Sequence, residues 1–421
     1  MSLLAYHIFL RLYTLAIRIL AFFQPKAKLW WKGRKDIFHL LAQKIQTPKK
    51  RIWVHCASLG EFEQARPVIE ALKLNLPDYA IILSFFSPSG YEIRKNYEGA
   101  DYVVYLPMDG KSNAARFISI VKPEFAIMVK YEFWYYYLTT LKKQNIPVYL
   151  ISAAFRESQP FFAWYGGLFR KMLRCFDTLF VQDRHSADLL LNLGMQNVVH
   201  AGDTRYDRVT GIARAAVEIP IVEKFKGNAP LLIAGSTWPK DEQVLRDAIH
   251  ALPEHWKIIL APHEITNTHL DHIRLLFEPE CVCYTRFEET YTQQRILIID
   301  NIGMLASIYR YGDIAYVGGG FLRGGIHNVL EPAVFGLPVI FGPNYEKFTE
   351  ACDLLKQGFA FPITDAAQCK EILTRLTELP DEVRHQNQIH LQNYIREQEG
   401  ATEKVLRVIL HKHIYQQPVS R

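Results

Sequence analysis

The sequence has few cysteines for its length and no regular arrangement of them. Six cysteines are spread over 421 residues, and the close pair Cys281 and Cys283 has no second pair with which to hold zinc. Buried free thiols in a reducing compartment are therefore expected. The motif G-x-x-x-x-G-K-[ST] is absent, and Gly318–Gly325 fails G-x-G-x-x-G because Arg323 stands where the last glycine is needed. The usual P-loop and dinucleotide fingerprints are thus excluded.

Negative charge is almost absent from the first 51 residues. Eleven Lys or Arg side chains are opposed there only by Asp36, so this segment carries a formal +10 in a chain whose total is +6, and the rest sums to −4. A nucleic-acid partner would require a basic face with stacking aromatics on the folded body, so none is expected. A basic collar beside an apolar segment instead indicates attachment to a membrane surface with anionic lipid.

The apolar segment runs from Leu3 to Phe23 and is long enough to cross a bilayer. Arg11 and Arg18 interrupt it seven residues apart, on one helical face. A spanning helix would bring Arg11 near the membrane centre at a cost of roughly 2.5–3.5 kcal/mol, which a helix lying in the membrane plane avoids. Residues 1–25 are therefore predicted to be a membrane-anchor helix, in plane or spanning, with the body in the cytoplasm. The alternative is an ordinary first helix packed on a domain.

After residue 50, short apolar runs alternate with helix-length segments. Continuous apolar runs predict parallel strands that are buried on both faces. The predicted strands are Ile52–His55, Ala80–Phe85, Tyr102–Leu106, Phe125–Val129, Val148–Ser152, Thr178–Val181, Val198–Ala201, Leu231–Ala234, Lys257–Ala261, Ile296–Ile299, Ile314–Val317, Val339–Phe341 and Phe359–Phe361. The fold class is therefore α/β, with two Rossmann-like doubly wound domains. This is the layout of the GT-B fold, in which substrates meet in a central cleft beyond the carboxyl ends of the strands.

The domain boundaries follow from where this rhythm changes. Residues 26–210 are predicted to form the N-terminal domain, and the weakly patterned residues 211–229 a linker. Residues 230–395 are predicted to form the C-terminal domain. Residues 396–421 are predicted to be a helix that crosses back to the N-terminal domain.

Candidate catalytic residues follow strands in the N-terminal half. Glu61 lies at a helix start, where a carboxylate can take a proton from a hydroxyl, yet Ser58-x-x-Glu61 is equally a capping box. Gly60 permits a close turn beside a substrate. Glu132 directly follows a strand; in isolation such an acid is a helix cap or a solvated side chain. Arg205 can stabilise a departing phosphate, or it can pair with a neighbouring aspartate at the surface.

The C-terminal half has four glycine- or proline-containing elements, each at the end of a predicted strand. They are Gly235-Ser236-Thr237, Pro262-His263-Glu264, Gly318-Gly319-Gly320 and the stretch Gly324–Ala333. Glycine lets the backbone approach a phosphate. Asn328 is predicted to begin a helix whose dipole favours that charge, and Glu331 to accept hydrogen bonds from ribose hydroxyls. Together these elements predict a nucleotide site.

These motifs together resemble the Kdo (3-deoxy-D-manno-octulosonic acid) transferases over nearly the whole chain. The resemblance is carried by W-V-H-C-A-S-L-G-E at 53–61, Y-E-F-W at 131–134, G-S-T at 235–237 and G-G-I-H-N-V-L-E-P-A at 324–333. It implies inverting transfer of Kdo from CMP-Kdo to a lipid A precursor, at the cytoplasmic face of a bacterial inner membrane. It implies no cofactor and no metal, which agrees with the absence of any D-x-D motif.

The resemblance also implies roles for residues. The N-terminal domain would bind the acceptor and the C-terminal domain CMP-Kdo, with Glu61 as general base and with Glu132 and Arg205 assisting the transition state. The residues expected to bind substrate or nucleotide are Ser58, Gly60, Gly235, Ser236, Thr237, Pro262, His263, Gly303, Met304, Leu305, Gly319, Gly320, Asn328, Val329, Leu330 and Glu331. The chain departs from the family where Pro262-His263-Glu264 replaces Pro-Arg-His, and where Arg205 replaces a frequent lysine.

Two alternatives from other classes stay open on the sequence. One is a different GT-B protein, such as a UDP-sugar transferase or a nucleotide-sugar epimerase, which nucleotide competition would distinguish. The other is a membrane-bound nucleotide sensor without catalysis, which would have no use for Glu61 and Glu132.

Overall fold

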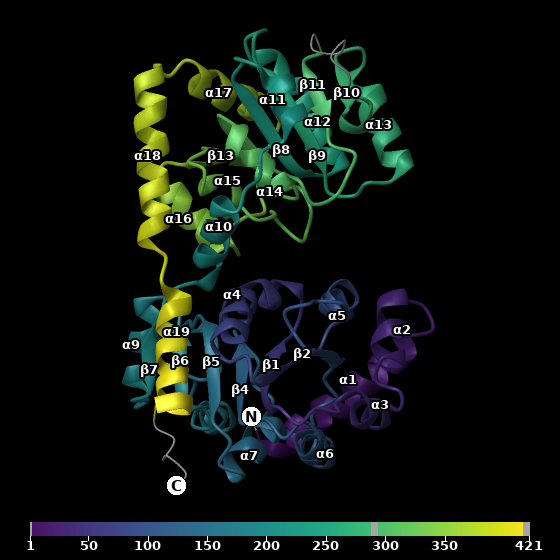
Figure 1. Ribbon diagram of the computed structural model, residues 1–421, viewed down its shortest axis with the longest axis vertical. Coiled ribbons are helices and arrows are strands. Elements are labelled where there is room, and N and C mark those ends of the chain that lie inside the picture. The colour runs from purple at the N-terminus through teal and green to yellow at the C-terminus, as the bar shows by residue number, and fades with distance from the viewer. Residues whose placement is uncertain (1, 288–293, 416–421) are drawn as a thin grey trace. The chain divides into compact units, whose positions relative to one another are not determined.

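The computed structural model describes residues 2–287 and 294–415 (Figure 1). The chain divides into two compact units, Met1–Arg208 together with Gln398–Arg421, and Val209–Glu397. Each unit contains one seven-stranded sheet in which every neighbouring pair of strands is parallel. Two doubly wound α/β units are thus present, as the sequence predicts.

The sheet of the N-terminal unit has the order β3-β2-β1-β4-β5-β6-β7. Its strands are β1 (Lys50–Cys56), β2 (Tyr79–Phe85), β3 (Tyr102–Tyr105), β4 (Phe125–Val129), β5 (Val148–Ala153), β6 (Thr178–Val181) and β7 (Val198–His200). The helices that connect them are α4 (Leu59–Asn75), α5 (Pro88–Arg94), α6 (Lys111–Val121), α7 (Tyr135–Lys143), α8 (Gly167–Leu173) and α9 (Arg184–Asn192). The strand order reverses between β1 and β4, and such a switch point opens a crevice at the carboxyl edge of a sheet.

Both faces of this sheet are covered by apolar packing. Trp53 of β1 belongs to a hydrophobic cluster on one face, whereas Ile52 and Val54 belong to the cluster on the other. Successive residues of a strand point to opposite faces. A strand buried on both sides therefore needs a continuous apolar run, which is why these strands are visible in the sequence.

The sheet of the C-terminal unit has the order β10-β11-β9-β8-β12-β13-β14, with its switch point between β8 and β12. Its strands are β8 (Leu231–Thr237), β9 (Lys257–Pro262), β10 (Cys281–Cys283), β11 (Ile296–Ile298), β12 (Ile314–Val317), β13 (Val339–Phe341) and β14 (Ala360–Pro362). Helices α12 (Pro239–Ala248), α13 (Asn267–Phe277), α14 (Leu305–Ile308), α15 (Leu330–Ala333), α16 (Thr349–Lys356) and α17 (Ala366–Thr377) lie between them.

The segment 211–229, predicted as a linker, contains regular structure. It holds the end of α10 (Thr204–Arg214) and all of α11 (Pro220–Lys226). Val222 and Phe225 of α11 are fully buried in a hydrophobic cluster of the C-terminal unit. The weak apolar pattern of this segment reflects a short helix that contributes only a few core residues.

The end of the chain completes the N-terminal unit. After α18 (Asp381–Glu397), helix α19 (Ala401–Leu410) buries Val405 and Ile409 in the cluster that contains Ile52. Asp207 anchors the start of α19, because its carboxylate accepts hydrogen bonds from the backbone N–H of Gly400 (2.6 Å) and of Thr402 (2.7 Å). Residues 416–421 of the predicted C-terminal helix lie outside the described residues.

Three helices precede the first strand: α1 (Leu3–Leu20), α2 (Pro25–Lys32) and α3 (Ile37–Lys44). Helix α1 buries only Tyr6 and Leu10. The Tyr6 hydroxyl donates a hydrogen bond to Asp109 (2.6 Å), which fixes this face of α1 on the N-terminal unit. Its other face exposes a regular apolar stripe, made of Leu4, Ile8, Leu12, Leu15 and Ile19.

Candidate active site

Glu61 lies on the first turn of α4, directly after β1. Its carboxylate Oε2 accepts a hydrogen bond from the backbone N–H of Ser58 (3.1 Å) and another from the Ser58 hydroxyl. The capping box allowed by the sequence is therefore formed. Among the described residues no hydrogen bond reaches Oε1 of Glu61, and the residue is partly exposed. One carboxylate oxygen thus holds the helix start while the other stays available to a substrate.

Glu132 follows β4 on the other side of the switch point and is 7% exposed. Its Oε2 lies 2.9 Å from Nε2 of His55 and accepts a hydrogen bond of 2.6 Å from the Trp134 indole N–H. Nδ1 of His55 is bonded to the Ser84 hydroxyl (2.8 Å), to which the Trp53 indole also donates (2.8 Å). The carboxylate is therefore held in one orientation by side chains from three strand ends.

The two carboxylates follow the neighbouring strands β1 and β4, although their segments are far apart in sequence. Burial raises the pKa of the Cys56 thiol well above its ordinary value, and the charges of Glu61 and Glu132 raise it further. Lys130, two residues before Glu132, has a φ of 65°, a left-handed conformation that costs energy for a side chain with a Cβ. Such strain at a strand end is typical of functional sites.

Arg205 lies in the first turn of α10 and is paired with Asp203. Its Nε and Nη2 donate to the Asp203 carboxylate at 3.0 and 2.6 Å. The ion pair considered from the sequence is thus present, and it is with Asp203; Asp207 instead holds α19. Two hydrogen bonds to one carboxylate fix the plane of the guanidinium, so Arg205 is held in a defined orientation.

In the C-terminal unit, glycines mark the carboxyl ends of β8 and β12. A Cβ on Gly235 would lie 2.0 Å from the Tyr309 hydroxyl and 3.0 Å from Leu305, so only glycine fits there. A Cβ on Gly320 would lie 2.5 Å from the backbone of Gly342. Ser236, between Gly235 and Thr237, has a φ of 53° and is therefore strained in the same way as the lysine after β4. The glycines, together with Leu305, thus lie at the carboxyl edge that flanks the second switch point.

Three rings stack at this edge, from the loops after β8, β9 and β12. Trp238 packs on His263 with centroids 4.8 Å apart, and His263 packs on His327 at 4.3 Å. The Trp238 indole N–H donates to Nε2 of His327 (3.0 Å), and burial lowers the pKa of His327 to about 4. His327 is therefore neutral at physiological pH and carries its hydrogen on Nδ1. Sequence analysis predicted His263 as a site residue but not Trp238 or His327, although His327 lies within the motif at 324–333.

A buried aspartate supports the backbone of this edge. Asp241 accepts hydrogen bonds from the backbone N–H of Gly319 (2.9 Å) and Trp238 (3.0 Å) and from the Tyr316 hydroxyl (2.8 Å). It is fully buried, and burial raises its pKa. The carboxylate thus ties the loops after β8 and β12 to each other.

The prediction that a helix with a useful dipole begins at Asn328 is wrong in both its starting residue and the size of the dipole. Helix α15 begins at Leu330 and has only 4 residues, so it has little dipole to offer. Asn328 caps it instead, since its Oδ1 accepts the Leu330 N–H (3.1 Å) while its amide donates to Glu331 (3.1 Å). Gly303, with a φ of 96°, and Met304 lead into α14, which begins at Leu305.

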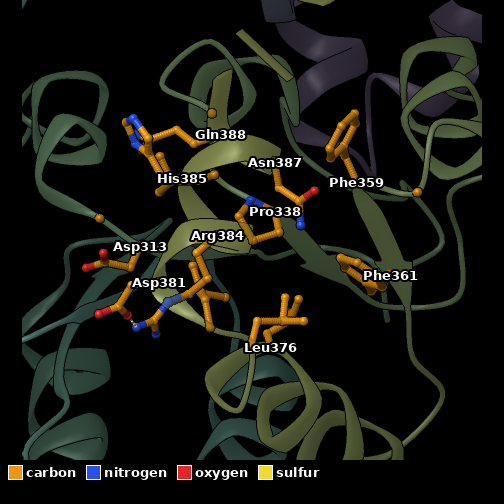
Figure 2. Close-up of a pocket in the computed structure, with 16 residues that line it drawn as sticks. Asp313, Pro338, Phe359, Phe361, Leu376, Asp381, Arg384, His385, Asn387 and Gln388 are labelled. Atoms are coloured by element: carbon orange, nitrogen blue, oxygen red, sulfur yellow. Dashed lines mark hydrogen bonds and ion pairs between the residues drawn. The ribbon is translucent and has the colours of Figure 1, made fainter. Parts of the chain in front are cut away.

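One cavity of the C-terminal unit lies away from all these residues. It has a volume of about 270 Å³ and is lined by residues at the amino ends of β12, β13 and β14, including Asp313, Pro338 and Phe359. Figure 2 shows Arg384 of α18 reaching toward Asp381 at its rim. None of the residues predicted to bind nucleotide lines it.

Comparisons with known proteins agree on a family. A family model described as 3-Deoxy-D-manno-octulosonic-acid transferase (kdotransferase) matches residues 31–208. The 3-deoxy-D-manno-octulosonic acid transferase of Aquifex aeolicus is 27% identical over 380 residues, which cover 87% of this chain and 96% of that protein. The protein of the same name from Haemophilus influenzae is 27% identical over 320 residues, covering 73% and 74%. A solved UDP-N-acetylglucosamine 2-epimerase has a TM-score of 0.60 at 14% identity, with 89% and 98% covered.

The doubly wound sheets and the structural likeness define the GT-B fold, and the sequence relatives make the chain a glycosyltransferase within it. The epimerase shares that fold at low identity, so the fold does not by itself separate transferase from epimerase. The sequence matches do, because the family model over residues 31–208 and the relatives at 27% identity are all 3-deoxy-D-manno-octulosonic acid (Kdo) transferases, and this chain is similar to that family.

Proposed function

We propose that this protein transfers Kdo from CMP-Kdo to a lipid A precursor, with inversion and without a metal ion. The observation that carries the proposal is the pair Glu61 and Glu132, which follow β1 and β4 and so flank the switch point of the N-terminal unit. The similarity to Kdo transferases supports the choice of donor and acceptor class. A nucleotide sensor without catalysis would not need two oriented carboxylates at this edge.

In the proposed reaction, an acceptor hydroxyl attacks the anomeric carbon of Kdo and its proton passes to Oε1 of Glu61. The bond from that carbon to the phosphate oxygen breaks, and CMP leaves with the bonding electrons. Glu132, held by His55 and Trp134, stabilises positive charge that develops on the sugar ring. The guanidinium of Arg205 stabilises the phosphate as it departs.

The donor is proposed to bind at the carboxyl edge of the C-terminal unit. Gly235, Gly319 and Gly320 let the loops at this edge pack closely on one another, because a Cβ at any of the three positions would meet other protein atoms. The remaining predicted contacts, from Pro262 and His263 to Glu331, are at the ends of neighbouring strands of the same sheet. The neutral stack that contains His263 stands where the family has an arginine, so this nucleotide site lacks that fixed positive charge.

The acceptor is lipid-bound, so the protein is proposed to act at the cytoplasmic face of a bacterial inner membrane. Helix α1 is apolar and long enough to cross a membrane. It buries Tyr6 against the N-terminal unit and exposes apolar side chains such as Leu12 and Leu15 on its other face. The contact with Asp109 would be lost in a spanning helix, which favours α1 lying in the membrane plane among anionic lipids.

The test compares wild type with Glu61→Gln, following transfer from CMP-Kdo to a tetra-acylated lipid A precursor with EDTA present. Glutamine still serves in a capping box, so the variant should fold normally and lose transfer by at least ~100-fold. Circular dichroism and CMP binding provide the controls for folding. Near-normal activity in the variant would leave Glu61 as a cap only. Absence of transfer by wild type would reject the proposed substrates.

A further inference from the structure

Two arginines, Arg34 and Arg116, line a cavity of the N-terminal unit that the proposed reaction does not use. The cavity has a volume of about 420 Å³ and lies between α2, α3, α6 and the end of β3. Its lining includes Trp30, Trp31, Arg34, Asn113 and Arg116. Asp36 is the one carboxylate among its lining residues, and its side chain is exposed.

Arg34 is a partly buried cation that donates hydrogen bonds to backbone carbonyls. Its guanidinium donates to those of Leu106 (2.9 Å), Trp30 (3.1 Å) and Phe86 (2.7 Å), and so uses three of its five N–H groups. Among the described residues no carboxylate lies within ion-pair distance of it. Burial lowers the pKa of Arg34 to about 9. Three aromatic rings, those of Trp30, Phe86 and Tyr105, also stack on the guanidinium, but no carboxylate among the described residues neutralises its charge, so the site can accept an anion.

A second cavity, of about 370 Å³, adjoins the first, since both are lined by Thr14, Met108 and Asn113. It adds Arg11 and Arg18 of α1, together with Asp109. Asp109 pairs with none of these arginines. Its carboxylate instead accepts hydrogen bonds from the Tyr6 hydroxyl and from two backbone N–H groups of α7. Within residues 2–287 and 294–415, none of the four arginines that line these cavities forms an ion pair.

Arg34 is connected to the candidate catalytic residue Glu132 through two aromatic side chains. The Arg34 guanidinium stacks over the Phe86 ring (4.9 Å), and Phe86 packs on Trp134 (4.8 Å), whose indole donates to Glu132. Two of the carbonyls that hold Arg34 belong to the residues directly after β2 and β3. The cavity is therefore at the same carboxyl edge of the sheet as Glu61 and Glu132.

We propose that this arginine-lined cavity binds a phosphate monoester on the sugar headgroup of the lipid acceptor. Arg34 and Arg116 would contact the phosphate oxygens, because guanidinium groups match a phosphate with paired hydrogen bonds. Arg11 and Arg18 would line the approach. The exposed Leu15 of the α1 stripe lines the second cavity. The acyl chains of the acceptor would therefore contact α1 next to the arginines that bind its phosphate. The identity of the acceptor rests on the proposed function. The ability of the arginine-lined cavity to bind an anion does not depend on it.

The test measures the Kd of the acceptor in detergent micelles by tryptophan fluorescence, with no CMP-Kdo present. The acceptor is used with its phosphates and after phosphatase treatment, on wild type and on Arg116→Gln. Removing phosphate should weaken binding to wild type by ~10-fold or more. Arg116→Gln should weaken binding of the intact acceptor similarly and make phosphatase treatment almost without effect. Arg116 is exposed, so its replacement should spare the fold.

The matched control is Lys111→Gln, which removes an exposed cation from the same helix but outside the cavity. It should bind both acceptor forms as wild type does. If wild type and Arg116→Gln lose the same factor on phosphatase treatment, the proposal is overturned.

Further arms separate the possible sources of phosphate. Inorganic phosphate should compete with the intact acceptor on wild type and not on Arg116→Gln. Phosphatidylcholine vesicles are also compared with vesicles that contain phosphatidylglycerol. If Arg116→Gln weakens only the binding to phosphatidylglycerol, the cavity binds phospholipid headgroups and the proposal fails. Loss of transfer with this binding pattern intact would reject only the proposed function.

Discussion

The orientation of Glu132 depends on single hydrogen bonds, so conservative substitutions can test its role. Trp134→Phe keeps a ring against Phe86 but removes the N–H that donates to the carboxylate (2.6 Å). A hydrogen bond to a charged group contributes about 1.5–3 kcal/mol. We expect kcat to fall ~10-fold or more, with little change in KM for CMP-Kdo, because the donor is proposed to bind the other unit.

The control is Trp164→Phe, a change at a side chain that is 91% exposed. It should leave kcat unaltered. A rise in KM for the donor with unchanged kcat in Trp134→Phe would contradict the proposed role of Glu132.

Residue-level predictions from sequence succeed where the contact is local. Ser58 and Glu61 are three residues apart, so the capping box could be read directly. His55 and Glu132 are 77 residues apart, and they meet only because β1 and β4 are neighbours in the sheet. Likewise the stack of rings around His263 depends on loops from three strands. Sequence motifs marked these segments, but not which side chains within them touch.

At the scale of elements, the π-helical turn His411–Tyr415 that follows α19 packs on the N-terminal unit through the buried His413. His413 stacks on Phe125 (centroids 4.2 Å apart) and its Nε2 is bonded to the Tyr149 hydroxyl (2.9 Å). Burial lowers the pKa of His413 from 6.5 to about 4, so the unfolded chain takes up a proton first as the pH falls. The contribution of neutral His413 to the free energy of unfolding is therefore fully present above about pH 6.5 and is lost progressively between that value and pH 4.

We expect His413→Phe to reduce this acid sensitivity. The variant loses the bond to Tyr149 and should be less stable at neutral pH, but its further loss on acidification should be smaller by about 1–2 kcal/mol. Urea unfolding of the N-terminal unit at neutral and mildly acidic pH measures the difference. An equal loss in both proteins would show that His413 does not carry the pH dependence.

Elements could be predicted from sequence where they are long and buried on both faces. All seven strands of the N-terminal unit contain or overlap a predicted apolar run. Strand β10 was missed because it is only Cys281–Cys283 at the edge of its sheet. Helix α15 was misplaced because the glycine-rich approach to it continues as a loop through Val329. Short elements carry too few residues to show a period.

At the scale of the whole molecule, the first 51 residues combine the basic charge with the exposed apolar stripe of α1. We expect the double change Leu12→Ser and Leu15→Ser to weaken binding to anionic vesicles by ~10-fold or more, because both side chains are largely exposed and can transfer into the membrane. Vesicle sedimentation measures the loss.

Leu275→Ser provides the matched control, since Leu275 is 74% exposed on α13 of the C-terminal unit. It should bind vesicles as wild type does. Equal binding by the double variant and the control would remove α1 from the membrane contact.

The return of α19 to the N-terminal unit has a consequence during synthesis. Ile52, Phe62 and Val405 share one hydrophobic cluster, so the first unit to leave the ribosome lacks part of its core until residues near the end of the chain have emerged. The C-terminal unit, which is continuous from Val209 to Glu397, needs nothing made after it. The later unit is thus able to finish folding before the earlier one, and the nascent protein presents an open apolar surface to chaperones or to the membrane in the meantime.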